Sequence, residues 1–257
     1  MSLLSKEEIE RYARHIMLRE VGGPGQQRLK RATVALVGVG GLGAPAALYL
    51  AAAGVGALRL IDDDQVSLSN LQRQILFTTQ SLGQGKTETA AAALTALNPH
   101  VMIDLRPTRL TPETAQALLQ GADLVLDGSD SFSTRFAVNA ACHALGIPLV
   151  SGAVGRWDGQ LGLFASGLTK AKPAKERLPC YRCFVPEEPP EAETCAAVGV
   201  IGALPGVIGA AMALEAVKHL TGAGQTLSGR LWLFDGLNLE SRTVVLPRDP
   251  ACPVCGD

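Results

Sequence analysis

Glycine-rich residues 38–43 are the first part of the chain whose residue types and spacing suggest chemistry. They read Gly-Val-Gly-Gly-Leu-Gly and fit the G-x-G-x-x-G pattern. Glycines let the backbone approach a phosphate closely, and the N-terminus of a following helix supplies free N–H groups and a partial positive charge. An apolar run at residues 33–37 precedes the loop and an alanine-rich run follows it, which is the context that the pattern requires. The loop indicates a nucleotide but not which one, and a glycine-rich turn without a ligand remains the alternative.

Charged side chains follow the next apolar run, at residues 57–61. Asp62 comes directly after that run, where an acid can bind the hydroxyls of a ribose. Arg73 and Lys86 come next along the chain, and cationic side chains stabilise the charge on a triphosphate and on departing pyrophosphate. An NAD-dependent dehydrogenase has little need of such cations, so the segment favours ATP. Either cation alone would be interpreted as a solvated surface charge.

Asp130 follows a later apolar run, at residues 123–127, in the phrase Asp-Gly-Ser-Asp. Ligands of doubly wound folds bind beyond the carboxyl ends of the strands. A carboxylate at this place can hold Mg²⁺, which prefers carboxylate and phosphate oxygens. Asp130 can also be the N-cap of a helix that begins at residue 132, and the two roles are compatible.

Four of the six cysteines form two C-x-x-C pairs, Cys180 with Cys183 and Cys252 with Cys255. Four thiolates can close a tetrahedral zinc site that has no open position, which marks a structural metal. In a reducing compartment the pattern favours a metal over disulfides. The pairs lie farther apart than is usual in a zinc ribbon, so two reduced or redox-active pairs remain the alternative. Cys142 lies on an apolar helix face and is expected in the core.

The elements that position these residues alternate between strand and helix over residues 1–150. A capping box of the S-x-x-E type at residues 5–8 predicts one N-terminal helix that continues through Tyr12 to Leu18. The hydrophobic pattern predicts strands at residues 33–37, 57–61, 101–105, 123–127 and 148–150, and helices at residues 42–53, 85–98, 111–119 and 132–145. This alternation predicts an α/β fold with a doubly wound, Rossmann-like, mainly parallel sheet.

The pattern changes over residues 151–257. Strand-like runs are found at residues 159–165, 230–235 and 242–246, and a helix is predicted at residues 205–220. We expect these strands to continue the sheet as an antiparallel C-terminal half. Residues 184–194 are acidic and proline-rich with little to bury, and they predict a flexible loop. The sequence thus predicts two halves, residues 1–150 and 151–257, of one compact domain.

Composition argues against several classes of protein. The formal net charge is −1, which disfavours a strongly electrostatic nucleic-acid binder. The N-terminus has neither a basic head nor an apolar core, so no secretory signal is predicted. Glycines and Pro205 interrupt the longest apolar run, residues 198–214, which predicts a buried helix rather than a membrane span. We expect a soluble, cytoplasmic protein that binds neither nucleic acid nor a membrane.

Six phrases in order make a resemblance specific, and they lie at residues 11–15, 38–43, 62–64, 67–73, 85–86 and 127–130. Together they resemble the MoeB/ThiF/HesA family, the bacterial relatives of ubiquitin-activating enzymes. The likeness covers essentially the whole chain, and residues 66–74, Val-Ser-Leu-Ser-Asn-Leu-Gln-Arg-Gln, carry it most specifically. It implies an adenylyltransferase that uses ATP and Mg²⁺ to adenylate the C-terminal glycine carboxylate of a small ubiquitin-like sulfur-carrier protein. Pyrophosphate would leave. Because the Gly-Gly tail of the carrier must be threaded to the ATP, we expect residues 151–257 to bind it in a groove near Arg156 and the acidic loop.

The resemblance also implies roles for individual residues. Asp62 binds the ribose, and Asp130 supports Mg²⁺. The phosphates are faced by Asn70, Arg73 and Lys86. Arg14 is expected to reach across a homodimer interface into the ATP site of the other subunit. The family carries the same paired cysteines, which favours structural zinc. The implied nucleotide-binding set is Gly38, Gly40, Gly41, Gly43, Asp62, Asp64, Ser69, Asn70, Leu71, Gln72, Arg73, Lys86, Asp130 and Ser131.

Cys195 follows the acidic loop and is not needed for a four-cysteine zinc site. In relatives on the thiamin pathway a cysteine at this place can become linked covalently to the carrier, and in the molybdopterin branch it is dispensable. A nucleophilic role needs a lowered pKa and exposure, so Cys195 stays open as a catalytic residue. The phrases at residues 67–74 and 194–195 favour the small subunit of molybdopterin synthase as carrier. The sequence has two residues after Cys255, so we expect no fused sulfurtransferase domain and a separate sulfur donor.

Three other functions predict different behaviour. An NAD-dependent oxidoreductase would give a nicotinamide spectral change and no pyrophosphate chemistry, and residues 67–73 count against it. A non-catalytic scaffold would bind ATP without turnover, although all the expected charged positions are occupied. A relative that adenylates a tRNA base is disfavoured by the near-neutral charge and by the lack of a basic tail.

Overall fold

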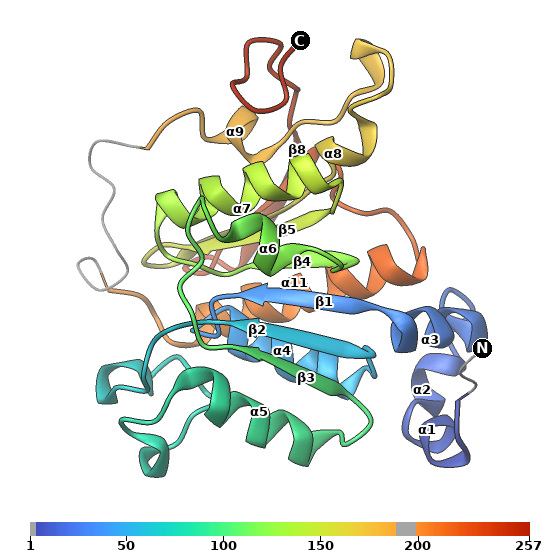
Figure 1. Ribbon diagram of the computed structural model, residues 1–257, viewed down its shortest axis with the longest axis vertical. Helices are drawn as coiled ribbons and strands as arrows, with labels where there is room; N and C mark the ends of the chain where they lie inside the picture. The colour runs from blue at the N-terminus through green and yellow to red at the C-terminus, as the bar shows by residue number, and fades with distance from the viewer. Residues whose placement is uncertain (1–3, 189–198) are drawn as a thin grey trace.

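The computed structural model describes residues 4–188 and 199–257. Within them the strands form one eight-stranded sheet in the order β3-β2-β1-β4-β5-β6-β7-β8 (Figure 1). Pairing is parallel from β3 to β5 and antiparallel from β5 to β8. The predicted α/β fold, a parallel sheet continued by antiparallel C-terminal strands, is confirmed. The strands are β1 Thr33–Val37, β2 Ala57–Ile61, β3 Met102–Arg106, β4 Leu124–Asp127, β5 Leu149–Val154, β6 Asp158–Phe164, β7 Arg230–Asp235 and β8 Glu240–Val245.

Burial distinguishes the centre of the sheet from its edges. β1 and β4 are almost wholly buried, as expected for parallel strands with a core on each face. Along β1, Val34 and Leu36 belong to one core while Ala35 and Val37 belong to the other. β8 is an edge strand and is mainly exposed. The central strands are therefore the rigid part of the fold, and their carboxyl ends lie on one side of it.

Helices cover both faces of the parallel part of the sheet. The core of Val34 receives α4 Gly43–Ala52, α5 Lys86–Leu97 and α11 Ala203–Thr221, and the core of Ala35 receives α6 Ala115–Leu119 and α7 Phe132–Leu145. Cys142 is buried in the second core, as predicted. α4 and α11 approach so closely that a Cβ on Gly209 would lie 2.5 Å from the Leu42 carbonyl oxygen. This helix contact therefore requires glycine.

α11 is the one helix of the described chain with the length and hydropathy of a membrane span. It packs against α3 Gly22–Arg31, α4, β5 and β6. Its buried residues include Leu204, Ile208 and Met212. The buried helix predicted at residues 205–220 is confirmed.

The N-terminal region differs from the prediction in its helices. The expected capping box forms, with Ser5 and Glu8 each accepting a hydrogen bond from the backbone N–H of the other. The expected single helix is broken at Tyr12 into α1 Lys6–Arg11 and α2 Ala13–Ile16. The buried Tyr12 hydroxyl accepts a hydrogen bond from Asn98 Nδ2 at 2.8 Å, which fixes the break against the end of α5.

α3 was not predicted because it begins Gly-Gly-Pro-Gly, a composition typical of a turn. Figure 1 shows α1, α2 and α3 together at the end of the molecule where β1 begins. They therefore lie at the amino ends of the parallel strands, away from the carboxyl ends.

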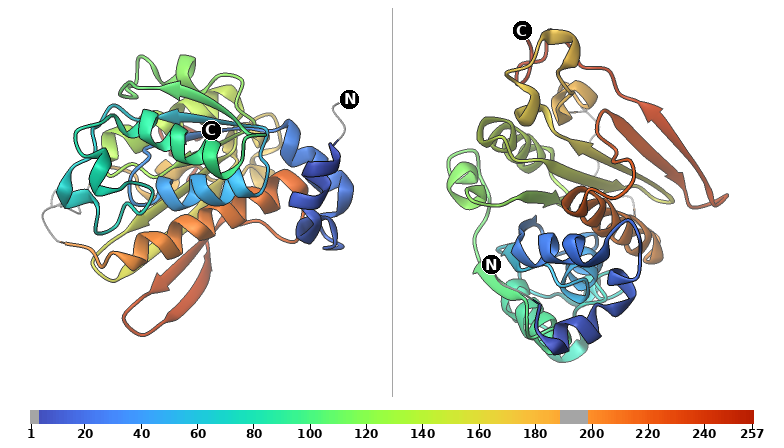
Figure 2. Two further views of the ribbon diagram at one scale, coloured as in Figure 1. Left: turned by 90° about the horizontal axis from the view of Figure 1, so that it is seen from below. Right: turned by 90° about the vertical axis from the view of Figure 1, so that its right-hand side faces the viewer.

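Short elements and a hairpin complete the fold. The loop between β2 and α5 contains the 3-10 turns η1 Leu68–Asn70 and η2 Thr79–Ser81, and the C-terminal half contains α8 Ser166–Thr169, η3 Ala174–Glu176 and α9 Tyr181–Phe184. Figure 2 shows the β7–β8 hairpin projecting from the body of the molecule. Residues 150 and 151, where the predicted halves meet, lie inside β5. Residues 189–194 of the predicted loop lie outside the described residues.

Candidate functional site

A cavity of about 560 Å³ opens beyond the carboxyl ends of the parallel strands. The loops after β1, β2, β3 and β4 all contribute to it, as expected for a doubly wound fold. One wall comes from the C-terminal half, including Gln160, Tyr181 and Pro205. Members of the predicted nucleotide-binding set that line the cavity are Gly38, Gly40, Gly41, Asp62, Asp64, Arg73, Lys86, Asp130 and Ser131.

The glycine loop joins β1 to α4 and forms part of the cavity floor. Gly38 has a φ of +83°, a conformation that favours glycine. A Cβ on Gly43 would lie 2.0 Å from the Gly38 carbonyl oxygen, so Gly43 closes the turn on itself. Gly43 is not among the cavity-lining residues, and its contribution is to shape the loop. The loop thus presents the backbone of Gly40 and Gly41, at the N-terminus of α4, to any ligand in the cavity.

Asp62 connects the glycine loop to the acidic residues 62–64 that follow β2. Its Oδ2 accepts a hydrogen bond from the Val39 N–H at 2.7 Å, and its Oδ1 accepts one from the Asp64 N–H at 2.9 Å. Burial raises the pKa of Asp62 above its ordinary value, while the charge of Lys86 and the two backbone hydrogen bonds act in the opposite direction. The Asp62 carboxylate is therefore a hydrogen-bond acceptor that two backbone N–H groups fix at the end of β2.

Lys86 begins α5 and is 5% exposed. Its Nζ lies 2.7 Å from Asp64 Oδ2, and Asp64 also accepts the Lys86 backbone N–H through its carbonyl oxygen at 2.9 Å. Asp63 pairs in the same way with Arg109 Nε, at 3.3 Å. Arg109 lines the cavity and was not predicted, because its position after β3 becomes informative only once β3 lies beside β2. The described cavity wall thus carries both cations and acids on neighbouring loops.

Arg73 lines the cavity from the loop after β2, where its Nη1 donates to the Ser69 carbonyl oxygen at 3.0 Å. Other predicted members of this loop do not line it, namely Ser69, Asn70, Leu71 and Gln72. Asn70 has a local role, because its side chain completes a capping box with Ser67 around η1. Gln74 was not predicted, yet it is buried, lines the cavity and has its Oε1 without a hydrogen-bond partner in the described structure.

Asp130 and Ser131 occupy the turn between β4 and α7. The N-cap of α7 is Ser131, whose Oγ accepts a hydrogen bond from the Thr134 N–H at 3.3 Å. The alternative that Asp130 is this cap is therefore wrong. Asp130 is exposed and lines the cavity, and within the described chain its carboxylate makes no hydrogen bond or ion pair. It is thus available to a cation, as an Mg²⁺ ligand must be.

The predicted catalytic residue Arg14 lies away from the cavity. Arg14 is exposed on α2, at the amino ends of the strands, and is not among the cavity-lining residues. The chain alone does not bring it to the nucleotide-binding residues. Cys195 lies outside the described residues.

The four paired cysteines form a second candidate site near the C-terminus. Cys180 and Cys252 have their Sγ atoms 3.6 Å apart, and those of Cys183 and Cys255 are 3.4 Å apart. All four Sγ atoms lie within 4.8 Å of one another, and none is in a disulfide. A tetrahedral zinc ion with Zn–S bonds of about 2.3 Å separates its sulfurs by about 3.8 Å. The four thiols therefore fit a zinc ion.

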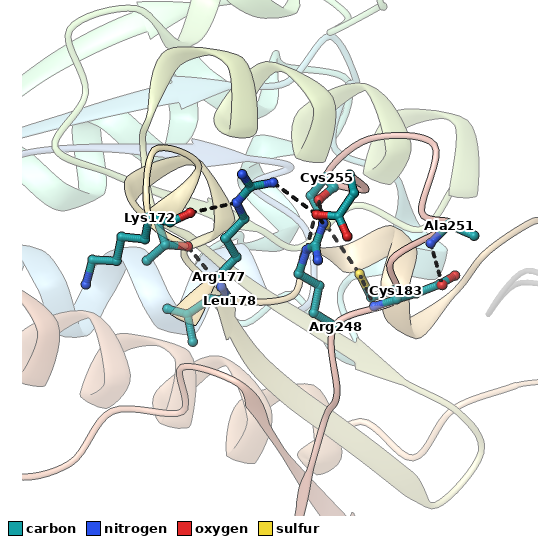
Figure 3. A network of polar contacts seen from close by, with 10 residues as sticks. Lys172, Arg177, Leu178, Cys183, Arg248, Ala251 and Cys255 are labelled. Carbon is teal, nitrogen blue, oxygen red and sulfur yellow. Dashed lines mark hydrogen bonds and ion pairs between the residues drawn. The ribbon is translucent and has the colours of Figure 1, made fainter. Parts of the chain in front are cut away.

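Neighbouring polar contacts hold the C-terminal tail around this cluster (Figure 3). Arg248 donates to the Cys255 carbonyl oxygen at 3.0 and 2.9 Å and to Asp257 at 2.9 Å, and Arg177 reaches Asp257 at 3.3 Å. The Asp249 N–H donates to Cys183 Sγ at 3.4 Å. Hydrogen bonds from the thiols of Cys180 and Cys255 lower the pKa of Cys183 well below the ordinary value of a thiol. The cluster thus already favours one thiolate, the form that binds a metal.

Comparisons with known proteins agree over almost the entire chain. The sequence matches the ThiF family over residues 12–254. It is 48% identical over 255 residues to the sulfur carrier protein adenylyltransferase of Thermus thermophilus, covering 98% of this chain and 93% of that protein. It is 43% identical to the sulfur carrier protein ThiS adenylyltransferase of Escherichia coli, covering 98% and 97%.

Two longer proteins are also similar to this chain, one in sequence and one in fold. The adenylyltransferase and sulfurtransferase MOCS3 of Drosophila grimshawi is 46% identical, and this chain spans 56% of its length. The crystal structure of MccB from E. coli superposes with a TM-score of 0.82 at 23% identity, over 98% of this chain and 74% of that one. At that identity the superposition speaks for the fold alone.

Proposed function

The chain belongs to the ThiF family, and we propose that it adenylates the C-terminal carboxylate of a small ubiquitin-like sulfur-carrier protein with ATP. The observation that carries the proposal is the cavity, which combines a glycine loop, an acceptor at the end of β2 and two cations on the loops that follow. The names of the relatives from T. thermophilus and E. coli support a sulfur carrier as the substrate.

The nucleotide would lie along the parallel strand ends. The backbone of Gly40 and Gly41 and the N-terminus of α4 suit phosphate oxygens, because N–H groups and the helix dipole converge there. Asp62 suits ribose hydroxyls, since it is an acceptor already fixed by two backbone bonds. Arg73, from the loop after β2, and Lys86, at the start of α5, would also bind the phosphates. Lys86 would exchange part of its contact with Asp64 for a phosphate oxygen.

The reaction needs little proton transfer. A carboxylate oxygen of the carrier attacks the α-phosphorus of ATP, the bond from that phosphorus to the bridging oxygen breaks, and pyrophosphate leaves with the electron pair. The carboxylate is ionised at neutral pH, so no general base is required. Alignment and charge stabilisation account for catalysis. Arg73 and Lys86 are the groups of this chain that stabilise the developing charge.

Asp130 fits Mg²⁺, because it is an exposed carboxylate without a partner in the described chain and it lines the same cavity. When bound, the ion would neutralise phosphate charge. Exposed carboxylates at residues 63 and 64 also lie nearby, but each is paired with a cation. Asp130 is therefore the better ligand among these acids.

A homodimer would complete the site with Arg14. This side chain lies at the amino ends of the strands of its own subunit, so only a second copy can bring such a residue to the cavity. Apolar side chains are exposed on the surrounding helices, with Met17 on the turn after α2 at 75%, Tyr49 on α4 at 60% and Leu214 on α11 at 63%. Such a surface suits contact with a second subunit.

The finer assignments rest on the sequence. We favour the small subunit of molybdopterin synthase as the carrier, with a thiamin-pathway carrier and a covalent step at Cys195 as the alternative. Structural zinc at the four cysteines and a separate sulfur donor complete the proposal. Unpaired thiols at this cluster suit a reducing compartment such as the cytoplasm.

Exchange of radiolabel between ATP and pyrophosphate tests the proposal. The small subunit of molybdopterin synthase and ThiS are each added to the protein, and the exchange rate is measured against a sample without carrier. We expect exchange with one carrier and loss of exchange in Arg73→Ala. A protein that gives no exchange with either carrier would contradict the proposal.

A further inference from the structure

The cavity continues past the nucleotide-binding residues to a wall with a different origin. This wall contains Arg135 from α7, Val154 from β5, Gln160 from β6 and Tyr181 from α9. It lies where the antiparallel strands β5 and β6 adjoin the segment of the first cysteine pair. None of these four residues belongs to the glycine loop or to the loop after β2, which carry the proposed phosphate contacts, so this wall is suited to the second substrate.

Arg135 is the charged group of this wall and is 7% exposed. Its Nη2 donates to the Ser129 carbonyl oxygen at 2.5 Å and its Nη1 to Ser151 Oγ at 3.4 Å. Both acceptors are neutral, and so is the hydroxyl of Tyr181, with which Arg135 also forms a side-chain hydrogen bond. The buried carboxylate of Asp127 accepts hydrogen bonds from Ser129 through Oδ1, and its Oδ2 has no hydrogen-bond partner among the described residues. Across residues 4–188 and 199–257 Arg135 forms no ion pair.

A buried guanidinium without an anion is energetically unfavourable, because burial removes its hydration and neutral acceptors compensate for only part of that loss. A carboxylate completes it best, since the planar guanidinium donates two parallel hydrogen bonds to the two carboxylate oxygens. The cavity therefore offers a carboxylate site that is separate from Arg73 and Lys86, and it lies on the same connected surface.

We propose that Arg135 binds the terminal carboxylate of the carrier tail and orients it toward the α-phosphorus. The inference rests on the proposed function, and it assigns recognition of the tail to a residue outside the expected site. A Gly-Gly tail has no side chains, so its charged end is the feature that distinguishes it most from other peptides. Arg135 would donate to both oxygens of that carboxylate, and one of them would attack with its remaining lone pair.

The test compares carriers that end in a free carboxylate with the same carriers ending in an amide. Dissociation constants are measured by fluorescence anisotropy of labelled ThiS and labelled molybdopterin synthase small subunit, in the absence of ATP. The native protein should bind the carboxylate form about 10- to 100-fold more tightly than the amide form, the usual range for a charge-assisted contact. Arg135→Gln should bind both forms alike, and Arg135→Lys should retain part of the preference.

Exchange kinetics give the second readout. Arg135→Gln should raise the KM for the carrier and leave the KM for ATP unchanged. Arg59→Gln is the matched control, because Arg59 is also a largely buried arginine that donates to backbone carbonyls but does not line the cavity. A rise in the KM for ATP alone would overturn the proposal, because Arg135 would then serve the nucleotide.

Retained preference for the carboxylate form in Arg135→Gln would also overturn it. If that variant does not fold, the native protein still decides, since equal binding of both carrier forms contradicts a carboxylate site. Failure of the proposed function looks different: the native protein would then show no carrier-dependent exchange at all.

Discussion

The nucleotide cavity and the four-cysteine cluster are built in contrasting ways. The cluster takes its ligands from two short segments, and within each segment the two cysteines are three positions apart. Its four Sγ atoms are already within 4.8 Å of one another. The cavity takes single side chains from the ends of separate strands, and its charged groups pair with one another, as Lys86 does with Asp64. One site is closed and local, whereas the other is open and depends on the topology of the sheet. The cluster should therefore govern stability, and the cavity should govern chemistry.

Loss of the metal ligands should give the largest effect on stability. Cys255→Ser leaves three thiols, so the variant should lose its zinc and at least about 4 kcal/mol of the free energy of unfolding, which corresponds to a Tm lower by roughly 10 °C or more. Metal content and thermal unfolding are measured together. Cys142→Ser is the matched control, because Cys142 is a buried thiol outside the cluster. A metal-free protein with an unchanged Tm would show that the cluster does not stabilise the fold.

Loss of the buried ammonium should affect chemistry and leave stability nearly unchanged. Lys86→Met should lower carrier-dependent ATP–pyrophosphate exchange by about 10²- to 10³-fold, the typical effect of removing one preorganised group that stabilises the transition state. Lys30→Met is the matched control, since Lys30 Nζ also lies 2.7 Å from a carboxylate oxygen, that of Glu8, but lies on α3 outside the cavity. Equal exchange rates in the two variants would remove Lys86 from the mechanism.

The edge strand β3 belongs to neither site and should give the smallest effect. Asp104 Oδ2 lies 2.7 Å from Arg59 Nε. Burial raises the pKa of Asp104, but hydrogen bonds from Arg59 and Arg106 outweigh it and the net pKa is below the ordinary value. The pair therefore stabilises the protein above the unfolded-state pKa of about 3.9, and this stability is lost as the pH falls through the lower folded-state pKa.

Asp104→Asn should accordingly cost up to about 1 kcal/mol at pH 7, and the difference should shrink below about pH 4. Urea unfolding at both pH values measures it. A cost that stays constant across this range would assign the effect of Asp104 to packing instead of charge. At pH 7 the exchange activity of Asp104→Asn should remain at the native rate.

The contrast between the sites also explains what the sequence could predict. The cysteine pairs and the glycine loop follow from spacing along the chain, and the order of strand and helix follows from local periodicity. Arg109 was missed because it reaches the cavity from the loop after β3, whereas Gln74 and Arg135 lie next to predicted residues and were missed because spacing does not show that their side chains are buried against the cavity. Their neighbours exist only after β3 lies beside β2 and the antiparallel strands close the far wall.

Local chemistry is a poor guide at two other places. The Gly-Gly-Pro-Gly start of α3 is typical of a turn, yet burial of Gln26 and Leu29 keeps the segment helical. Ser131, rather than Asp130, caps α7, because its position relative to the Thr134 N–H is correct for a cap. The start of α3 depends on a tertiary contact, and the cap of α7 depends on a shift of one position. Spacing along the chain does not resolve either.

Intact mass spectrometry of the carrier tests the central claim most directly. The protein is incubated with ATP, Mg²⁺, pyrophosphatase and either ThiS or the small subunit of molybdopterin synthase, and the carrier is then weighed. We predict a carrier that has gained one adenylyl group, lost again when hydroxylamine is added, and absent from a carrier that ends in an amide. A carrier of unchanged mass in every reaction, with ATP intact, would contradict adenylation of its C-terminal carboxylate.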